Sequence, residues 1–576
     1  MGGNMKLRGI GASDGVAYGK VFKLEKVIFE ISEEKTTKPE EEIKALKQGM
    51  AETEKDIEGI KKRAKEQLSE EEAAIFDAHL EILKDPELMD QTLCLIRQQH
   101  YKAAKAFHEI SENFAHLFEM MDNAYMKERA ADVRDVSRRV LSHILQVSLT
   151  DPSDIKEEVI IVADDLTPSD TAQLNKCYAK GFVTQVGGRT SHSAIMARSL
   201  EIPAVVGVEE ILSKVNAEDY LMIDGLSGEI TINPTEEDLK EYHEKKAAYA
   251  KKKEQLLTYK DQSTQSQDGY HVELAANIGS VQDLEGVIEN GAEGIGLFRT
   301  EFLFMGKKKC PDEDLQYEAY KAVLETMGEK PVVIRTLDVG GDKAIDYIHV
   351  SEEMNPFLGH RAIRLCLDQE DIFTLQLRAL LRASVHGNLK IMFPMIATLD
   401  EYRQAKKMLE SCQEDLKKEG YQVSDQIEVG IMVEIPSTAV LADQFAKEVD
   451  FFSIGTNDLI QYTFAADRIN EKVAYLYQPF NPALLRMIKM VIDAAHETGI
   501  WTGMCGEMAG NPLAAPVLLG LGLDEFSMSA SSILPIRKLM ASIKKEDMEH
   551  LAQKALQCGT SDEVMTLIKK YIPRGV

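Results

Sequence analysis

The C-terminal half of the chain contains eight short apolar runs, each followed by a segment with helical periodicity. These runs begin at His271, Ala292, Pro331, Leu389, Ile427, Val449, Gly499 and Leu523. Strands that alternate with helices form parallel sheets, and eight such units in succession close into a (β/α)8 barrel. The sequence therefore predicts a barrel over residues 268–576.

Polar side chains follow the predicted barrel strands at their carboxyl ends, where barrel enzymes carry their chemistry. The residues at the strand ends are Arg299, Arg335, Glu434, Asn457, Asp458 and Cys505, and those shortly beyond are Lys343, Arg361 and Arg468. Arginine forks match phosphate and carboxylate oxygens, so several converging arginines predict an anion rich in oxygens. Any one of these side chains alone would more often form a structural ion pair or a cap. Together they predict a site for a small phosphorylated carboxylate.

Two of these residues, Glu434 and Asp458, are a pair of hard oxygen ligands. Such a pair suits Mg²⁺, which binds few protein carboxylates and keeps substrate phosphate in its shell. Cys505 lies in "GMCGEMAG" at a predicted strand end, where a thiol can move a proton to or from a substrate carbon. The other six cysteines are expected to be small buried hydrophobes. No CxxC spacing is present, so we expect neither a zinc site nor a disulfide framework, and a reduced cytoplasmic compartment.

The N-terminal half contains two kinds of sequence pattern. Short β-rich runs occupy residues 1–30 and 148–233 and predict a small α/β domain, whereas residues 31–147 are charged and helical and predict an inserted bundle of four helices. Asp85-Pro86 is expected to end one of these helices and open the next. Residues 234–267 read as a charged helix followed by a polar, unstructured linker, "KDQSTQSQDG".

A histidine stands where the α/β domain makes a tight turn before a helix, in "VGGRTSHSAIMARSLEIPAVVG". The helix N-terminus suits a phosphate, and Gly187 and Gly188 let the backbone approach it closely. Imidazole is nucleophilic near neutral pH, so His192 is a candidate phosphate acceptor. Three hydroxyl residues are candidates to orient the ring or contact the phosphoryl oxygens: Thr171, Thr190 and Ser191. Taken alone, the motif fits a structural histidine equally well, and the anion site in the barrel favours the phosphohistidine.

The chain carries a formal net charge of −28. This acidity argues against binding nucleic acid or an anionic membrane, both of which need a surplus of basic residues. It favours a basic protein partner. No apolar run approaches the ~20 residues that span a bilayer, and no signal peptide is expected at the N-terminus.

Six motifs in order resemble the enzyme I family of the bacterial sugar phosphotransferase system, which belongs to the phosphoenolpyruvate-utilising enzymes. They are "GGRTSHSAIMARSLEIPAVVG", "GIGLFRTEFLFM", "IRTLDVGGDK", "NPFLGHRAIR", "FSIGTNDLIQYTFAADR" and "GMCGEMAG". The resemblance covers nearly the whole chain. It implies a phosphotransferase that moves the phosphoryl group of phosphoenolpyruvate to its own histidine, releases pyruvate, and passes the group to the histidine phosphocarrier protein HPr.

The resemblance also implies roles for single residues. His192 would carry the phosphoryl group beside Thr171, and Cys505 would protonate the enolate. Glu434 and Asp458 would hold Mg²⁺. Substrate would be held by Arg299, Arg335, Arg361 and Arg468, with Asn457 and Lys343 assisting. The helical insert would dock HPr through Glu70, Glu71, His79, Asp85, Glu87 and Arg129, and the barrel would form a homodimer.

One histidine cannot occupy the barrel mouth and the phosphocarrier surface together, so a swivel of the phosphohistidine domain is expected. Three alternatives remain open on the residues alone. One is an enzyme like pyruvate phosphate dikinase or phosphoenolpyruvate synthase that lacks its nucleotide domain. The second is a barrel lyase or mutase for which His192 is dispensable, and the third is a regulatory scaffold whose acidic bundle binds a basic partner.

Overall fold

The computed structural model describes residues 4–572 with gaps. The gaps are residues 25–26, 28, 68–69, 121–123, 150–151, 153–154, 167–169, 171–173, 175–176, 189–193, 195–196, 198–201, 306–308, 341–344, 346, 349–352, 468–469 and 471. Two compact units divide the chain, Met1–Lys252 and Lys253–Val576. Each is described by itself. No helix in the described ranges is long and apolar enough to cross a membrane.

The C-terminal unit is a closed barrel of eight parallel strands in the order β10-β11-β12-β13-β14-β15-β16-β9. The strands are β9 (Glu273–Ile278), β10 (Gly294–Arg299), β11 (Pro331–Arg335), β12 (Asn388–Phe393), β13 (Glu428–Val433), β14 (Phe451–Ile454), β15 (Trp501–Met504) and β16 (Glu525–Met528). Each coincides with one of the eight apolar runs, β12 starting one residue before its run, so the predicted (β/α)8 barrel is confirmed.

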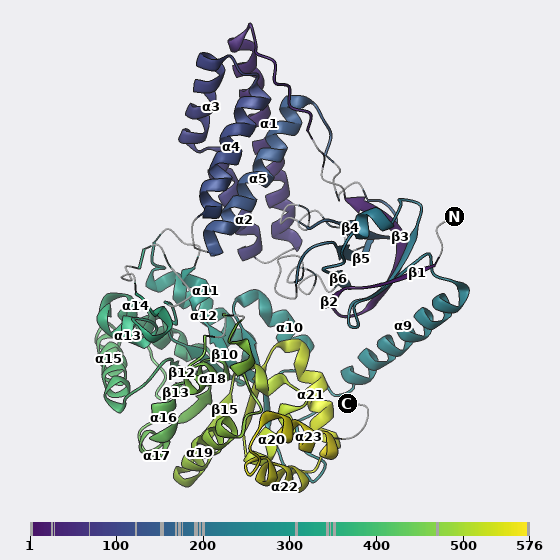
Figure 1. The fold of residues 1–576 in the computed structure, drawn as a ribbon. Coiled ribbons are helices and arrows are strands. Elements are labelled where there is room, and N and C mark those ends of the chain that lie inside the picture. The colour runs from purple at the N-terminus through teal and green to yellow at the C-terminus, as the bar shows by residue number, and fades with distance from the viewer. Residues whose placement is uncertain are drawn as a thin grey trace. The chain divides into compact units, whose positions relative to one another are not determined.

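Helices surround these strands (Figure 1). They are α10 (Leu284–Glu289), α11 (Glu301–Phe304), α12 (Glu313–Met327), α13 (Ile363–Asp368), α14 (Glu370–Ala383), α15 (Leu399–Lys418), α16 (Pro436–Val440), α17 (Ala442–Phe445), α18 (Thr456–Phe464), α19 (Pro482–Thr498), α20 (Ala514–Leu521), α21 (Ala530–Ser542), α22 (Lys545–Ala555) and α23 (Ser561–Tyr571). Short 3-10 turns are η2 (Val281–Asp283), η3 (Pro356–Leu358), η4 (Ser384–His386), η5 (Ala474–Leu476) and η6 (Glu507–Gly510).

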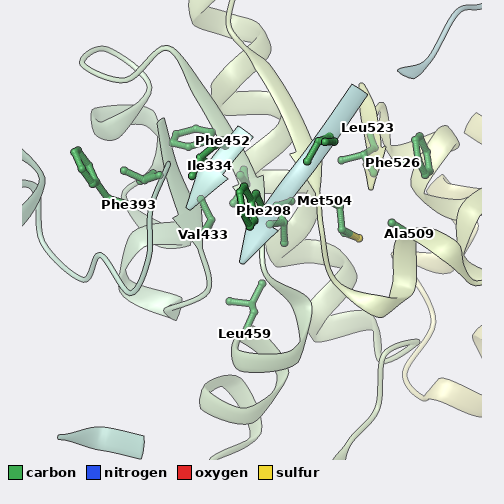
Figure 2. Packing of buried hydrophobic residues seen from close by; sticks show 14 of the residues in the cluster. Phe298, Ile334, Phe393, Val433, Phe452, Leu459, Met504, Ala509, Leu523 and Phe526 are labelled. Carbon is green, nitrogen blue, oxygen red and sulfur yellow. The ribbon is translucent and has the colours of Figure 1, made fainter. Parts of the chain in front are cut away.

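Side chains alternate between the two faces of each barrel strand, as the period of two requires. One set packs outward against the helices in the main hydrophobic core, where Figure 2 shows Phe298, Ile334 and Val433. The other set fills the barrel interior. Its middle is a small apolar cluster of Leu297, Val333, Met392, Met432, Phe451 and Cys505. We call this cluster the apolar plug.

Below the apolar plug, at the amino ends of the strands, lies a charged group that we call the barrel floor: Glu273, Lys390, Glu428, Trp501 and Glu525. Lys390 Nζ lies 2.6 Å from Glu428 Oε2, to which Trp501 Nε1 also donates at 3.0 Å. Glu273 and Glu525 are direct partners on β9 and β16. The apolar plug therefore separates two polar ends of the barrel interior.

The N-terminal unit contains an eight-stranded mixed sheet in the order β1-β8-β7-β3-β4-β5-β6-β2. Its strands are β1 (Met5–Arg8), β2 (Ile10–Ser13), β3 (Val16–Leu24), β4 (Val159–Ala163), β5 (Ala179–Thr184), β6 (Ala204–Val206), β7 (Tyr220–Asp224) and β8 (Glu229–Ile232), and α8 (Ile211–Lys214) precedes β7. β3 pairs in parallel with β4, so the chain returns to the same sheet after its helical stretch. This pairing accounts for the β-rich runs on both sides of the helices.

The helical stretch comprises α1 (Pro39–Gln67), α2 (Glu70–Leu83), α3 (Pro86–Gln99), α4 (Ala103–Met120) and α5 (Ala124–Leu145). The described residues thus form five helices, and the expectation of four is wrong. The predicted break at Asp85-Pro86 is confirmed, since α2 ends just before it and α3 begins at Pro86. Leu46, Phe76, Ile96, Phe107 and Val136 pack together in the core of these helices.

The charged helix α9 (Glu236–Leu257) is also confirmed, but the segment after it is not an unstructured linker. Thr264 is fully buried and Ser266 is 4% exposed. The buried Arg537 of α21 donates to Thr264 Oγ1 at 2.8 Å and to the backbone carbonyls of Tyr259 and Lys260. This polar segment is therefore fastened to the barrel unit, because its polar groups satisfy a buried guanidinium.

Candidate functional site

Two arginines predicted to bind an anion lie side by side in the barrel mouth. Arg335 ends β11 and is 6% exposed, and Arg361 precedes α13 and is 2% exposed. Asp338 accepts from both, with 2.9 Å between its Oδ2 and Arg335 Nη1 and 2.9 Å between its Oδ1 and Arg361 Nη2. Glu301 accepts from Arg335 Nη2 at 2.7 Å. Burial opposes both positive charges, but the surrounding carboxylates outweigh it and raise the pKa of each arginine.

The backbone around these arginines is held closely. Gln376 of α14 accepts from Leu337 N at 2.8 Å and donates to Thr300 Oγ1 at 3.0 Å, which ties together the loops after β10 and β11. Gly340 has φ +106°, and a Cβ there would lie 2.6 Å from Arg361 Cβ. The glycine therefore permits the close approach of the loop after β11 to Arg361. Such rigid loops hold the guanidinium groups in fixed positions.

The two carboxylates predicted to bind metal also reach this site. Glu434 follows β13 and is 2% exposed, and Asp458 lies in the first turn of α18 and is 6% exposed. Asp458 Oδ2 lies 3.3 Å from Arg361 Nη2, and Glu434 Oε1 accepts from Met395 N at 2.6 Å. Burial, then the nearby charges of Asp458 and Asp338, raises the pKa of Glu434 to about 8.

The charge balance of the mouth bears on whether a cation fits there. Four carboxyl groups, those of Glu301, Asp338, Glu434 and Asp458, face the guanidinium groups of Arg335 and Arg361. The carboxylate oxygens of Glu434 and Asp458 are hard donors of the kind that fit a divalent cation of the Mg²⁺ type. Within the described ranges no three His, Cys, Asp or Glu side chains form a complete metal site. Glu434 and Asp458 would supply two ligands, and Mg²⁺ usually keeps further positions for substrate oxygens or water.

Cys505 follows β15 and is 4% exposed, with its Sγ 3.8 Å from the carbonyl of Ile454. Burial raises the pKa of its thiol to about 11, against the lowering influence of Ser453 and Arg335. The thiol is therefore protonated at neutral pH, as a proton donor requires. Of the other cysteines, Cys366 and Cys412 are buried as expected, but Cys94 and Cys177 are exposed.

Of the four remaining residues predicted at the mouth, the structure describes two. Arg299 ends β10 with an exposed side chain. Asn457, in the first turn of α18, accepts from Tyr477 OH at 2.7 Å through its Oδ1. Lys343 and Arg468 lie outside the described residues.

The predicted phosphohistidine region is described only at its edges. His192, Thr171, Thr190 and Ser191 lie outside the described residues. Gly188 lies in the loop after β5, where Gly187 has φ +114° and Val186 N donates to Asp164 O at 3.0 Å. Downstream, Ala194 and Ala197 are fully buried in the core beneath the sheet. On the two sides of residues 189–193, Val186 is thus hydrogen-bonded to the backbone of Asp164, and Ala194 and Ala197 are packed in the core.

The predicted docking residues of the helical stretch divide into several groups. Glu87 is exposed, and Asp85 caps α3 by accepting from Glu87 N at 2.8 Å and Leu88 N at 3.4 Å. Arg129 is half-buried in α5. The side chains of Glu70 and Glu71 in α2 lie outside the described set.

His79 differs from its predicted place on a docking surface. It is 1% exposed, its Nε2 lies 3.2 Å from Asp132 Oδ1, and its ring meets Phe76 edge-on. The helical period turns this position of α2 toward α5, so its ring does not contribute to an exposed docking surface in this structure.

Sequence reasoning missed Asp338, Glu301 and Tyr462. Asp338 and Glu301 lie in the quoted motifs "IRTLDVGGDK" and "GIGLFRTEFLFM", three and two residues after a strand-end arginine. That spacing was a usable signal. Tyr462 OH accepts from Arg361 Nη1 at 3.4 Å; the residue lies in the quoted motif "FSIGTNDLIQYTFAADR", four residues after Asp458 and on the same helix face.

The arrangement can bind a multiply charged oxyanion beside a divalent cation and donate a proton to a nearby carbon. Among the described residues, the buried Nε atoms of Arg335 and Arg361 have no hydrogen-bond partner. Leaving a buried charged donor unpaired is costly, so the two Nε groups indicate an anion that completes the site.

Comparison with known proteins gives concordant matches along the chain. Residues 253–545 match the family described as PEP-utilising enzyme, PEP-binding domain, residues 8–129 its N-terminal domain, and residues 155–228 its mobile domain. A phosphoenolpyruvate-protein phosphotransferase of Staphylococcus carnosus (strain TM300) is 58% identical over 98% of this chain and 99% of its own length. Proteins of the same name from Staphylococcus aureus and Geobacillus stearothermophilus are each 57% identical over 98% of this chain, covering 99% and 98% of their own lengths.

Proposed function

The chain belongs to the family of phosphoenolpyruvate-utilising enzymes, and from this premise we propose that it is a phosphoenolpyruvate–protein phosphotransferase whose phosphoryl acceptor is His192. The phosphoryl group of phosphoenolpyruvate passes to His192 and then to a histidine of the phosphocarrier protein HPr. This reaction is the first step of sugar uptake by the bacterial phosphotransferase system.

The observation that carries the substrate assignment is the pair of buried guanidinium groups of Arg335 and Arg361. Each has an Nε without a partner among the described residues, and both are bound by the same carboxylate. Planar donors in this arrangement suit the phosphoryl oxygens of the substrate. Arg299, Asn457, Lys343 and Arg468 would hold the rest of the substrate.

Proton transfer is assigned to Cys505. When the bond between the enol oxygen and phosphorus breaks, the electron pair stays on oxygen and gives the enolate of pyruvate. Because the pKa of the buried thiol is about 11, the thiol carries a proton that it can give to the methylene carbon. Pyruvate then leaves, and the thiolate recovers a proton before the next turnover.

The resident cation is proposed to be Mg²⁺, held by Glu434 and Asp458. When bound, it would supply positive charge to the phosphoryl oxygens. The raised pKa of Glu434 supports this choice, since a bound cation would favour the ionised carboxylate that burial first, and the charges of Asp458 and Asp338 second, disfavour.

The second half-reaction needs His192 to leave the barrel and meet the phosphocarrier. We assign the docking surface to the helical stretch, with Glu70, Glu71, Asp85, Glu87 and Arg129 as contacts, and leave out the buried His79. We also propose a homodimer formed through the barrel, which the exposed apolar side chains of Met354, Leu358 and Tyr475 support. The swivel moves the α/β domain between the two sites.

The test is incubation of the purified protein with phosphoenolpyruvate labelled in its phosphoryl group, with and without Mg²⁺. We expect an acid-labile, alkali-stable label on the peptide that contains His192. The label should be absent from His192→Ala and from metal-free protein. Cys505→Ala should fold normally and release pyruvate at least 100-fold more slowly, because it has lost the proton donor.

Three outcomes would contradict the assignment. Label from ATP would favour a dikinase. Consumption of substrate by His192→Ala at the normal rate would favour a barrel lyase. A folded protein that binds HPr but takes no label would favour a scaffold.

A further inference from the structure

One carboxylate lies between the two buried arginines of the barrel mouth. The Asp338 side chain is 3% exposed, and its two oxygens each lie 2.9 Å from a different guanidinium group, those of Arg335 and Arg361. The resulting bridge uses both ends of the carboxylate. A carboxylate can do this because it accepts at two oxygens, whereas an amide accepts at one only.

We propose that Asp338 is a positioning residue that sets the separation and the planes of Arg335 and Arg361, so that both contact one phosphoryl group. The inference rests on the proposed function, because it takes phosphoenolpyruvate as the anion. It assigns Asp338 no contact with the reacting atoms.

The like charges of Arg335 and Arg361 are offset by the carboxylate between them. Two buried guanidinium groups repel each other strongly in a medium of low dielectric, and a shared counter-charge is needed to hold them close. Arg361 depends on Asp338 most closely, since its other contacts, with Asp458 Oδ2 at 3.3 Å and Tyr462 OH at 3.4 Å, are longer. Arg335 has a second close carboxylate, since Glu301 accepts from its Nη2 at 2.7 Å.

Asp338 also fixes the direction of the Nε–H groups of Arg335 and Arg361. Asp338 and the other contacts occupy the Nη ends of both guanidinium groups. The Nε atoms of both arginines remain without partners among the described residues. Holding a planar fork by its Nη end fixes the direction of its Nε–H, so the shared carboxylate determines where those two donors point.

The backbone on both sides of Asp338 is buried and hydrogen-bonded. The neighbours of Asp338, Leu337 and Val339, are each 1% exposed, and Leu337 N donates to the buried Gln376. Ala362 N donates to Val339 O at 2.9 Å, which ties the segment of Arg361 directly to the segment of Asp338. The bridge therefore has a fixed length, and displacing the carboxylate by one methylene group should disturb it.

The experiment compares Asp338→Asn and Asp338→Glu with the wild type. The matched control is Asp450→Asn, since Asp450 precedes β14 at the opposite end of the strands and its oxygen accepts from Val429 N at 2.7 Å. For each protein we would measure the thermal midpoint, the Kd for phosphoenolpyruvate with Mg²⁺ by calorimetry, and the single-turnover rate of labelling of His192 at saturating substrate.

For Asp338→Asn we expect the Kd to rise about 10–100-fold and the single-turnover rate to fall at least tenfold, because substrate and transition state both lose aligned donors. Asp338→Glu keeps the charge but alters the bridge, so it should not restore either value. Asp450→Asn should match the wild type in both.

The inference is overturned if Asp338→Asn binds phosphoenolpyruvate within threefold of the wild type, whatever its thermal midpoint, or if Asp338→Glu recovers wild-type values. Should Asp338→Asn fail to fold, Asp338→Glu decides the question alone. A wild type that binds phosphoenolpyruvate without labelling His192 would defeat the proposed transfer and leave the binding comparison valid. A wild type that does not bind it would defeat both.

Discussion

At the residue scale, carboxyl groups are buried at both ends of the barrel interior, under different conditions. In the mouth, guanidinium groups accompany them. In the barrel floor, Glu273 and Glu525 share the neighbourhood of Lys390, which is already bonded to Glu428. Burial, with the neighbouring carboxylates, raises the pKa of Glu273 to about 7 and that of Glu525 well above its ordinary value. The floor therefore holds protons at neutral pH.

A stability prediction follows for Glu525→Gln. A carboxyl whose pKa is higher in the folded than in the unfolded state makes the fold lose stability as pH rises from its unfolded pKa, ~4.3, through its folded pKa. Glutamine removes this penalty while keeping the shape. We expect the variant to be more stable than the wild type by roughly 1–3 kcal/mol at pH 8, with the gap shrinking toward zero near pH 4. Thermal midpoints across this pH range measure it.

The matched control is Glu448→Gln in the same unit. Glu448 accepts from Arg403 Nη2 at 2.6 Å and from Arg403 Nε at 3.1 Å, and this pairing lowers the pKa of its carboxyl. A carboxyl whose pKa is lowered by folding adds stability at high pH, so this replacement should destabilise the protein at pH 8. If Glu525→Gln behaves in the same way, the floor does not store a proton.

At the element scale, a charged residue at a helix end can have a structural role as well as a binding role. The family resemblance implies that Asp85 is a docking residue, and the structure also makes it the N-cap of α3. An N-cap satisfies backbone N–H groups that the helix leaves unpaired, and asparagine performs this as well as aspartate does. Capping and docking at this position can therefore be separated.

We predict that Asp85→Ala lowers the free energy of unfolding by about 1 kcal/mol, whereas Asp85→Asn leaves it unchanged. Both variants should weaken binding of HPr, because both lose the negative charge. Thermal unfolding and calorimetric titration with HPr measure the two effects. Glu87→Gln, which loses charge without losing the cap, is the control for docking. If Asp85→Asn binds HPr with wild-type affinity, Asp85 caps the helix but does not contribute to docking.

At the scale of the whole molecule, α9 joins the two units and is fastened at both of its ends. At its start, Asp238 accepts from Thr235 N at 2.9 Å and from Asn4 Nδ2 at 2.8 Å, and Tyr242 packs against Tyr18 of β3. Just beyond its end, Arg537 holds the carbonyls of Tyr259 and Lys260. Movement of one unit against the other would therefore use freedom within α9 or directly after Leu257.

We predict that deleting one helical turn, Ala247–Ala250, impairs turnover more than substrate binding. The deletion leaves both fastened ends intact, but it changes the reach and rotation of one unit against the other. Because transfer requires close approach of the reacting atoms, we expect labelling of His192 to slow at least tenfold while the Kd for phosphoenolpyruvate changes less than twofold. Tyr249→Ala is the control. Equal losses in rate and binding would argue against a swivel.

The sequence by itself determined which segments form strands and helices and which reactive side chains lie at the strand ends. Strand–helix alternation is a local property of the chain, so the eight barrel strands, the helical insert and α9 could be located without tertiary information. The strand-end rule likewise selected Arg335, Glu434 and Cys505, because parallel strands bring their carboxyl ends to one rim.

Only the tertiary structure decided which polar side chains satisfy one another. The bridge of Asp338 between two arginines, the burial of His79 and the fastening of Thr264 by Arg537 all join residues on different elements or depend on the face that a helix turns inward. Such contacts depend on distance in space, and sequence spacing carries little information about it. The same limit made the polar segment before the barrel resemble a free linker, since hydroxyl side chains such as those of Thr264 and Ser266 can bond buried partners as readily as they face water.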